Sequence, residues 1–231
     1  MKIPGIVGGI APESTIHYYR LMIDAYRKRT ADGSYPNILV NSIDMKRMLD
    51  LIGGNDLPSA ASYLAGEAEK LARAGADFAL FASNTPHIVF DEVQRLVSLP
   101  LLSIVEAACG SACRLGWKRA GLFGTRFTMQ ASFYPEVFAR HGIAVVVPQD
   151  GEQEYIHAQY MSELVAGIFR PETRGRMEQI AARMREQDRI DGLVLGGTEL
   201  PLLLADPESA GIPLLDTTKI HAEAAVAMMF S

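Results

Sequence analysis

The chain has 231 residues, a formal net charge of −5, and 48% hydrophobic against 21% charged residues. This balance argues against an intrinsically disordered chain, and the mild acidity argues against a nucleic-acid partner, which would require a basic surface. No apolar run in the sequence approaches the roughly 20 residues that span a bilayer, so we expect no membrane partner. The apolar stretch at the N-terminus is too short for a signal peptide, and we therefore expect a cytoplasmic protein.

Short aliphatic runs alternate with longer amphipathic segments along the chain. The short runs predict strands at residues 5–8, 37–42, 78–82, 101–103, 120–124, 144–147, 193–196 and 214–216. The amphipathic segments predict helices at residues 14–29, 57–74, 90–96, 105–115, 128–141, 152–169, 171–187 and 218–229. Such alternation is typical of an α/β fold in which a mainly parallel sheet is flanked by helices on both faces.

The two halves of the sequence are weakly similar to each other. The GIVG that starts at Gly5 matches the GLFG that starts at Gly121, an offset of 116 residues. Further along the chain, Ser83 aligns with Gly197 at an offset of 114. A third match aligns Leu99-Pro100-Leu101 with Ile212-Pro213-Leu214 at an offset of 113. Three matches at nearly one offset predict two pseudo-symmetric α/β lobes.

The duplication also predicts where a ligand binds. We expect residues 1–100 together with 210–231 to form an N-terminal lobe, and residues 101–209 to form a C-terminal lobe. Ligands of open α/β sheets bind at the carboxyl ends of the strands. Lobes that face each other would bring two equivalent loops to one small molecule, so we expect the active site in the cleft between them. A duplicated scaffold without a reaction stays open as an alternative.

Four strand-to-helix turns, at residues 8–15, 83–87, 124–128 and 196–199, carry small and polar residues. Their hydroxyl, amide and backbone N–H groups are typical of a site that binds a carboxylate. The residues expected to bind the substrate are Gly9, Ser14, Asn84, Thr85, Thr125, Thr128 and Thr198. For any one of these turns alone, an ordinary loop with capping Ser and Thr residues is an open alternative.

Other site chemistries find little support in the sequence. The glycine-containing turns lack both the dinucleotide-binding pattern and the lysine of a phosphate-binding loop. The histidines have no metal-ligand spacing, and both His87 and His221 are expected to be structural. Cys109 and Cys113 lie one helical turn apart, where core packing is the simple reading. No lysine marks a pyridoxal site, so we expect neither a metal nor an organic cofactor.

Taken together, the polar turns resemble those of the aspartate/glutamate racemase superfamily, the cofactor-independent amino-acid racemases. The resemblance covers nearly the whole chain and rests on Gly8-Gly9 with Glu13-Ser14-Thr15, on Ser83-Asn84-Thr85-Pro86-His87, on Gly124-Thr125-Arg126-Phe127-Thr128, and on Gly197-Thr198-Glu199. It implies two lobes, a homodimer, and a small acidic amino acid or related carboxylate bound between the lobes without a cofactor.

The sequence departs from this family at the two catalytic positions. The resemblance implies one cysteine on each side of the substrate Cα, but the matching residues are Ser83 and Gly197. A serine hydroxyl is a far weaker acid than a thiol, and glycine has no side chain, while each positioned acid or base is worth roughly 10² to 10⁴ in rate. We therefore expect two-thiol catalysis to be lost or altered, with water, Glu13, His87 or Glu199 as substitutes, and we include Glu199 among the catalytic residues.

Three functions remain open at this point. The first is a racemase-family isomerase with altered catalysis, which is the reading we adopt. The second is a cofactor-free lyase or decarboxylase that uses the same carboxylate site, as arylmalonate decarboxylases of the superfamily do. The third is a non-catalytic protein that binds carboxylates. Stabilisation of negative charge by the polar turns would serve either of the two enzymes.

Overall fold

The computed structural model describes residues 1–204 and 211–231 and divides the chain into two compact units. The first unit consists of Met1–Ile104 and His221–Ser231, and the second of Val105–Ile220. In the described residues each unit holds one four-stranded sheet, and all strand pairs are parallel. The structure thus confirms the predicted α/β fold with two parallel sheets that are flanked by helices.

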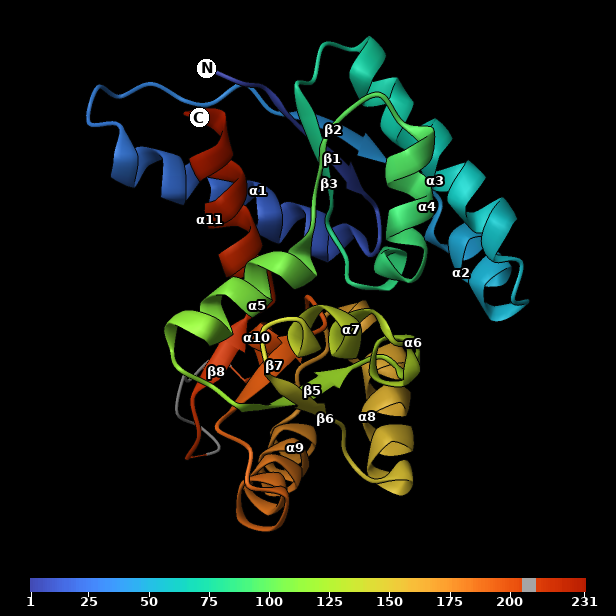
Figure 1. Cartoon of the computed structure of the whole chain (residues 1–231), viewed down its shortest axis with the longest axis vertical. Coiled ribbons are helices and arrows are strands. Elements are labelled where there is room, and N and C mark those ends of the chain that lie inside the picture. The colour runs from blue at the N-terminus through green and yellow to red at the C-terminus, as the bar shows by residue number, and fades with distance from the viewer. Residues whose placement is uncertain (205–210) are drawn as a thin grey trace. The chain divides into compact units, whose positions relative to one another are not determined.

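The first unit is built on strands β1 (Pro4–Gly8), β2 (Leu39–Ser42), β3 (Phe78–Phe81) and β4 (Leu101–Leu102), in the order β2-β1-β3-β4. Figure 1 shows α1 (Pro12–Arg29) and α11 (Thr217–Met229) on one side of this sheet. On the other side lie α3 (Leu57–Arg73) and α4 (Phe90–Leu96), with α2 (Met45–Gly53) beside α3 and a 3-10 turn, η1 (Thr85–Val89), before α4. Ile6, Tyr18 and Leu80 belong to the apolar core that α1 and α11 form with the sheet.

The second unit repeats this plan with β5 (Arg119–Gly124), β6 (Ala144–Val146), β7 (Gly192–Gly196) and β8 (Leu214–Asp216), in the order β6-β5-β7-β8. Its helices are α5 (Ile104–Arg114), α6 (Arg126–Gln130), α7 (Phe133–Ala139), α8 (Asp150–Ser162), α9 (Pro171–Arg183) and α10 (Leu200–Leu203), with the short turns η2 (Leu164–Ala166) and η3 (Met184–Asp188). Residues of α8 and α9 bury their apolar faces against β5 and β7, and Figure 1 shows α5 and α7 on the opposite side of the sheet.

The strand orders confirm the duplication that the sequence predicts. In each sheet the first strand in sequence lies between the second and the third, and the fourth strand pairs with the third. The same close packing recurs where the first strand of each sheet ends. A Cβ at Gly8 would lie 2.6 Å from Oγ1 of Thr15, and a Cβ at Gly124 would lie 2.8 Å from Cβ of Thr128. A threonine of the following helix therefore occupies the space that a larger strand-end residue would need.

The unit boundaries differ from the expected lobes. β4, which we placed in the C-terminal lobe, pairs with β3, so residues 101–104 belong to the first unit. β8, which we placed in the N-terminal lobe, pairs with β7, so residues 211–220 belong to the second unit. The expected boundary at residues 209 and 210 lies outside the described residues. The physical reason is that each half of the sequence keeps its own fourth strand, which hydrogen-bonds to the third.

Two helix predictions also change. The single helix predicted at residues 128–141 is two helices, α6 and α7, because the chain extends at Ala131 between them. The helix α2 was not predicted, although its sequence contains a start signal. The Asp44 side chain accepts the backbone N–H of Lys46 at 2.9 Å, which caps the helix, and Met48 and Ile52 form its buried face.

Candidate functional site

In each unit the polar turns meet at the carboxyl edge of the sheet. β1 and β3 are hydrogen-bonded neighbours with Val7 paired to Phe81, so the turns that follow them start side by side. β5 and β7 are neighbours in the same way, with Gly124 paired to Gly196. The four turns of the sequence analysis therefore form two pairs, one in each unit.

The first pair of turns is tied together by its own side chains. The Ser14 hydroxyl donates to the Ala82 carbonyl at 2.6 Å, and the backbone N–H of Gly9 donates to Oγ1 of Thr15 at 2.8 Å. Gly9 has φ +82, and a Cβ there would lie 2.7 Å from Oγ of Ser42, so only glycine fits. The Ser14 hydroxyl therefore donates a hydrogen bond to the protein backbone, and it links the turn after β1 to the end of β3.

The turn after β3 contains three buried polar residues that we expect at the site, Ser83, Asn84 and Thr85. They precede and enter η1, whose first turn is closed by a hydrogen bond from the N–H of His87 to the Asn84 carbonyl at 3.0 Å.

His87 belongs to η1 and has both ring nitrogens engaged with the backbone. Its Nδ1 lies 3.2 Å from the Asn84 carbonyl, and its Nε2 accepts the Ile104 N–H at 3.2 Å. The ring stacks on Phe90 at 4.8 Å between centroids. Burial lowers the pKa of His87 to about 3, with a smaller contribution from His221. The histidine is therefore neutral near pH 7 and joins the turn to α5, which suits the structural role expected for it.

His221 is buried in the same unit and is also held at both nitrogens. Its Nε2 donates to the Leu102 carbonyl at 3.0 Å, which leaves Nδ1 to accept the Tyr18 hydroxyl at 2.8 Å. Burial lowers its pKa to about 4. The structure thus places His221 as a link between α1, β4 and α11.

In the second unit, the side chains of Thr125 and Thr128 contact each other and the backbone of their own turn. Thr125 is the N-cap of α6, and its Oγ1 lies 3.4 Å from both the N–H and the hydroxyl of Thr128. Thr128 is fully buried beneath Gly124 and Gly196. Thr125 therefore caps the start of α6, whereas Thr128 packs beneath the turn.

The turn after β7 contains a buried carboxylate, Glu199, with two hydroxyl partners. The carboxylate oxygen Oε2 of Glu199 accepts the hydroxyl of Thr198 at 2.8 Å and also the phenol of Tyr160, which lies on α8. Glu199 is 2% exposed and Tyr160 is 5% exposed. Burial, and then the neighbouring Glu199 carboxylate, raise the pKa of Tyr160 well above its usual value. The phenol therefore keeps its proton and donates a hydrogen bond to Glu199.

Tyr160 also fills the space beside Gly197. A Cβ at residue 197 would lie 2.8 Å from the phenol oxygen and 2.9 Å from Cζ of Tyr160, closer than side chains approach one another. Glycine is therefore required as long as Tyr160 holds this position. Sequence reasoning missed Tyr160, although a glycine at a position expected to carry a side chain was a signal that another residue occupies its place.

The other candidate features of the sequence lie outside these turns. On α5, Cys109 is buried as expected, whereas Cys113 is exposed, so the core-packing prediction is wrong for Cys113. Within residues 1–204 and 211–231, no three His, Cys, Asp or Glu side chains are grouped to hold a metal ion. Over the same described ranges, we find no helix with the length and hydropathy needed to cross a membrane.

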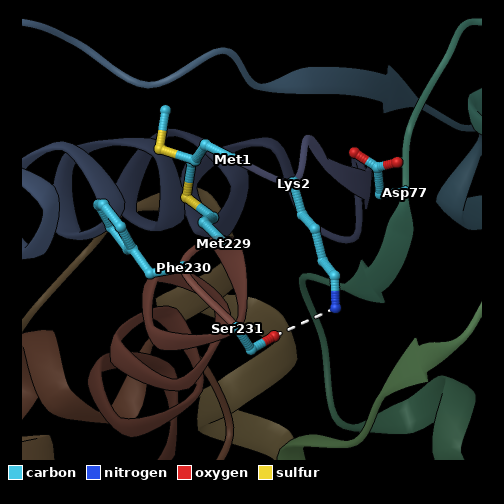
Figure 2. A pocket seen from close by; sticks show the side chains of 6 residues that line it. All are labelled: Met1, Lys2, Asp77, Met229, Phe230 and Ser231. Carbon is cyan, nitrogen blue, oxygen red and sulfur yellow. Dashed lines mark hydrogen bonds between the residues drawn. The ribbon is translucent and has the colours of Figure 1, made fainter.

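Figure 2 shows a pocket at the opposite edge of the first sheet. It is lined by residues from both ends of the chain and by Asp77, and the Lys2 ammonium donates to the Ser231 hydroxyl across it at 3.1 Å. Lys2 precedes β1 and Asp77 precedes β3, so this pocket lies at the amino ends of the strands. It contains none of the expected site residues, and ligands of parallel sheets bind at the carboxyl ends.

Comparison with known proteins identifies the family. The family model described as Asp/Glu/Hydantoin racemase matches residues 7–225. The chain belongs to this racemase family. The broad specificity amino-acid racemase RacX of Bacillus subtilis is 27% identical to this chain over an alignment of 231 positions, and the alignment covers 96% of each chain.

Two solved structures resemble this racemase-family chain over the full length of both chains. A candidate Asp/Glu racemase from Yersinia pestis superimposes with a TM-score of 0.90 at 33% identity. An aspartate racemase homologue from Pyrococcus horikoshii superimposes with a TM-score of 0.86 at 34% identity.

Proposed function

We propose that this racemase-family protein is an isomerase that acts at the α-carbon of a small acidic amino acid or related carboxylate. Neither strand-end position implied by the family resemblance is a cysteine, so the reaction follows a route other than a two-thiol one. The observation that carries the proposal is the pairing of polar turns at the carboxyl edge of each sheet. Membership in a racemase family directs that observation towards chemistry at Cα.

The proposed roles follow from what each side chain already binds. Asn84 and Thr85 lie in the turn after β3, and Thr125 caps a helix, so these residues and Gly9 are proposed to bind the substrate carboxylate. Thr198 is proposed to contribute its backbone N–H, because its hydroxyl donates to Glu199. Ser14 and Thr128 are proposed to support the turns, because their hydroxyls face the backbone or the adjacent threonine. We propose that the turns of both units act on one substrate and that no cofactor takes part.

A cofactor-free lyase is the second candidate, and one observation favours it. Among the two strand-end positions, 83 and 197, neither carries a thiol, and the buried carboxylate Glu199 follows only the second. Loss of CO₂ from a malonate-type acid leaves a carbanion that needs a single proton donor, whereas racemisation requires both removal and return of a proton. A site whose only strong acid–base group is Glu199 therefore meets the need of the lyase reaction for a single proton donor.

Proton NMR in deuterated buffer separates these functions. The purified protein would be incubated with aspartate, glutamate, further amino acids and malonate-type acids. Loss of the α-proton signal together with formation of the other enantiomer supports the isomerase. Release of a substrate fragment supports the lyase. Ligand-dependent rise of the melting temperature with neither change would show a carboxylate-binding protein and contradict both enzymes.

We further propose that the protein is a cytoplasmic homodimer, as the family resemblance implies. Light scattering coupled to size-exclusion chromatography measures the mass in solution. A mass near twice 25.2 kDa is expected, and a monomer mass at micromolar concentration would contradict the dimer.

A further inference from the structure

We propose that Tyr160 and Glu199 form a proton-transfer pair at the end of β7 and replace the side chain that is missing at position 197. This inference rests on the proposed reaction at Cα and names the group that moves the proton on one side of the substrate. It concerns a tyrosine on α8 that the strand-end motifs do not include.

The position of the phenol carries the argument. The phenol oxygen lies 2.8 Å from the point where a Cβ of residue 197 would stand. This distance is shorter than a van der Waals contact, so the phenol group of Tyr160 occupies space that a side chain at position 197 would need. Tyr160 in its present place leaves no room for a side chain at position 197. The glycine therefore makes room for the tyrosine.

The surroundings of Glu199 argue for a function rather than for stability. Burying a carboxylate costs several kcal/mol unless hydrogen bonds compensate the loss of water. Two hydroxyl donors, from Tyr160 and Thr198, converge on the same oxygen, Oε2. A buried acidic group that is paired with a titratable partner at a strand end is a common feature of catalytic sites.

The proposed step balances in protons and charge. The Cα–H bond of the substrate breaks, and its electron pair stays on the substrate as an enolate-like anion. The proton forms a bond to the phenol oxygen of Tyr160, while the original phenol proton passes to Oε2 of Glu199. Tyr160 is neutral before and after the step, and the Glu199 carboxylate becomes a carboxylic acid. In the reverse direction the same two transfers return a proton to Cα, and Thr198 holds Glu199 in place through its hydrogen bond.

Two conservative substitutions test the Tyr160–Glu199 pair. Tyr160→Phe removes only the phenol oxygen, and Glu199→Gln removes only the charge. Tyr134→Phe is the matched control, because Tyr134 is another buried tyrosine of the second unit and its phenol is hydrogen-bonded to Thr217. The measurement is the rate of α-proton exchange with deuterated solvent, using the substrate found in the panel above. Substrate-induced change in melting temperature measures binding in the same samples.

The pair predicts that Tyr160→Phe and Glu199→Gln each lower the exchange rate by about 10² or more, while substrate binding is kept and Tyr134→Phe exchanges like the wild type. Wild-type exchange that survives in Tyr160→Phe would overturn the pair and leave the proposed function standing. A wild-type protein that exchanges no proton of any panel member would overturn both. If Glu199→Gln does not fold, Tyr160→Phe decides the question, because it keeps the ring that fills the space beside Gly197.

Discussion

The turns after β3 and β7 hold equivalent places in the two sheets but carry different chemistry. In the first unit, the buried histidine of the turn has both nitrogens engaged with the backbone and stays neutral. In the second unit, the Tyr160 phenol donates a hydrogen bond to the Glu199 carboxylate at the corresponding sheet edge. By the duplication, Thr85 is the counterpart of Glu199, and Ser83 is the counterpart of Gly197.

This difference shows which properties a duplicated fold keeps. Both halves keep the strand order and the close packing of a strand-end glycine against a threonine of the following helix. The polar side chains of the turns after β3 and β7 differ between the halves. We therefore expect catalysis to depend unequally on the two turns, and the predictions below test that inequality.

The largest expected effect compares the two turns directly. Glu199→Gln is expected to lower turnover by about 10² or more, because it removes a positioned proton acceptor. Ser83→Ala is expected to change turnover by less than about tenfold, because an unactivated serine hydroxyl is a poor acid and a poor base. Steady-state kinetics of both variants on the same substrate checks this. Equal losses in both would show that the two turns contribute equally.

The second prediction concerns acid stability and the first unit. His87 and His221 have an unfolded pKa near 6.5, and their folded pKa values are lowered to about 3 and about 4. Below pH 6.5 the two histidines therefore bind protons in the unfolded chain but stay neutral in the folded chain. The stability that the neutral histidines contribute is complete above pH 6.5 and is lost as the pH falls towards 4, by about 1.4 kcal/mol per pH unit for each histidine.

Urea unfolding between pH 7 and pH 4.5 measures this slope. His87→Gln is expected to lower the free energy of unfolding at pH 7, because it disturbs the link between Asn84 and Ile104, and to remove about half of the slope. A variant with the full wild-type slope would show that other groups cause the acid sensitivity.

The third prediction tests the exclusion between Gly197 and Tyr160. Gly197→Cys is expected to cost about 1 to 3 kcal/mol, because its Cβ overlaps the phenol, whereas Ser83→Cys is expected to cost less than about 1 kcal/mol. In a Tyr160→Leu background the cost of Gly197→Cys should fall, and a double-mutant cycle by chemical denaturation measures that coupling. If the costs of Gly197→Cys and Tyr160→Leu are additive, the two residues do not interact, and the overlap between the phenol and a side chain at position 197 is contradicted.

The same exclusion bears on attempts to restore two-thiol chemistry. Ser83→Cys combined with Gly197→Cys is expected to gain racemisation of an acidic amino acid only when Tyr160 is also shortened. Chiral chromatography of the product measures the gain. Activity in the double variant with Tyr160 intact would contradict the overlap.

The smallest expected effect is at the α6 cap. Thr125→Ala removes the side chain that accepts the Thr128 N–H and is expected to cost about 1 kcal/mol, while Thr125→Ser should keep most of the stability. Thermal unfolding followed by circular dichroism compares the two variants. A loss of the same size in both would show that the threonine methyl group, rather than the hydroxyl, stabilises the turn.

The sequence predicts the strands and the positions of the polar turns because both follow from local patterns. Aliphatic runs mark β1, β3, β5 and β7, and the small polar residues after them mark the sheet edge. Assignment of β4 and β8 to the wrong lobes shows the limit of this approach, since pairing depends on hydrogen bonds between distant segments.

The same limit explains which residues of the candidate site could be predicted from the sequence. Glu199 and Thr198 are visible in a strand-end motif, whereas Tyr160 reaches them from α8, and no local pattern links the two segments. The use of the Ser14 and Thr128 side chains within their own turns likewise depends on three-dimensional contacts.

The most direct test of the unequal turns is the ratio of α-proton exchange to inversion, measured for each enantiomer by NMR in deuterated buffer and by chiral chromatography. One strong acid–base pair predicts that one enantiomer exchanges its α-proton with retention much faster than it inverts, by about 10² or more. Exchange and inversion at equal rates from both enantiomers would mean that both turns supply equally effective groups, and would contradict the account.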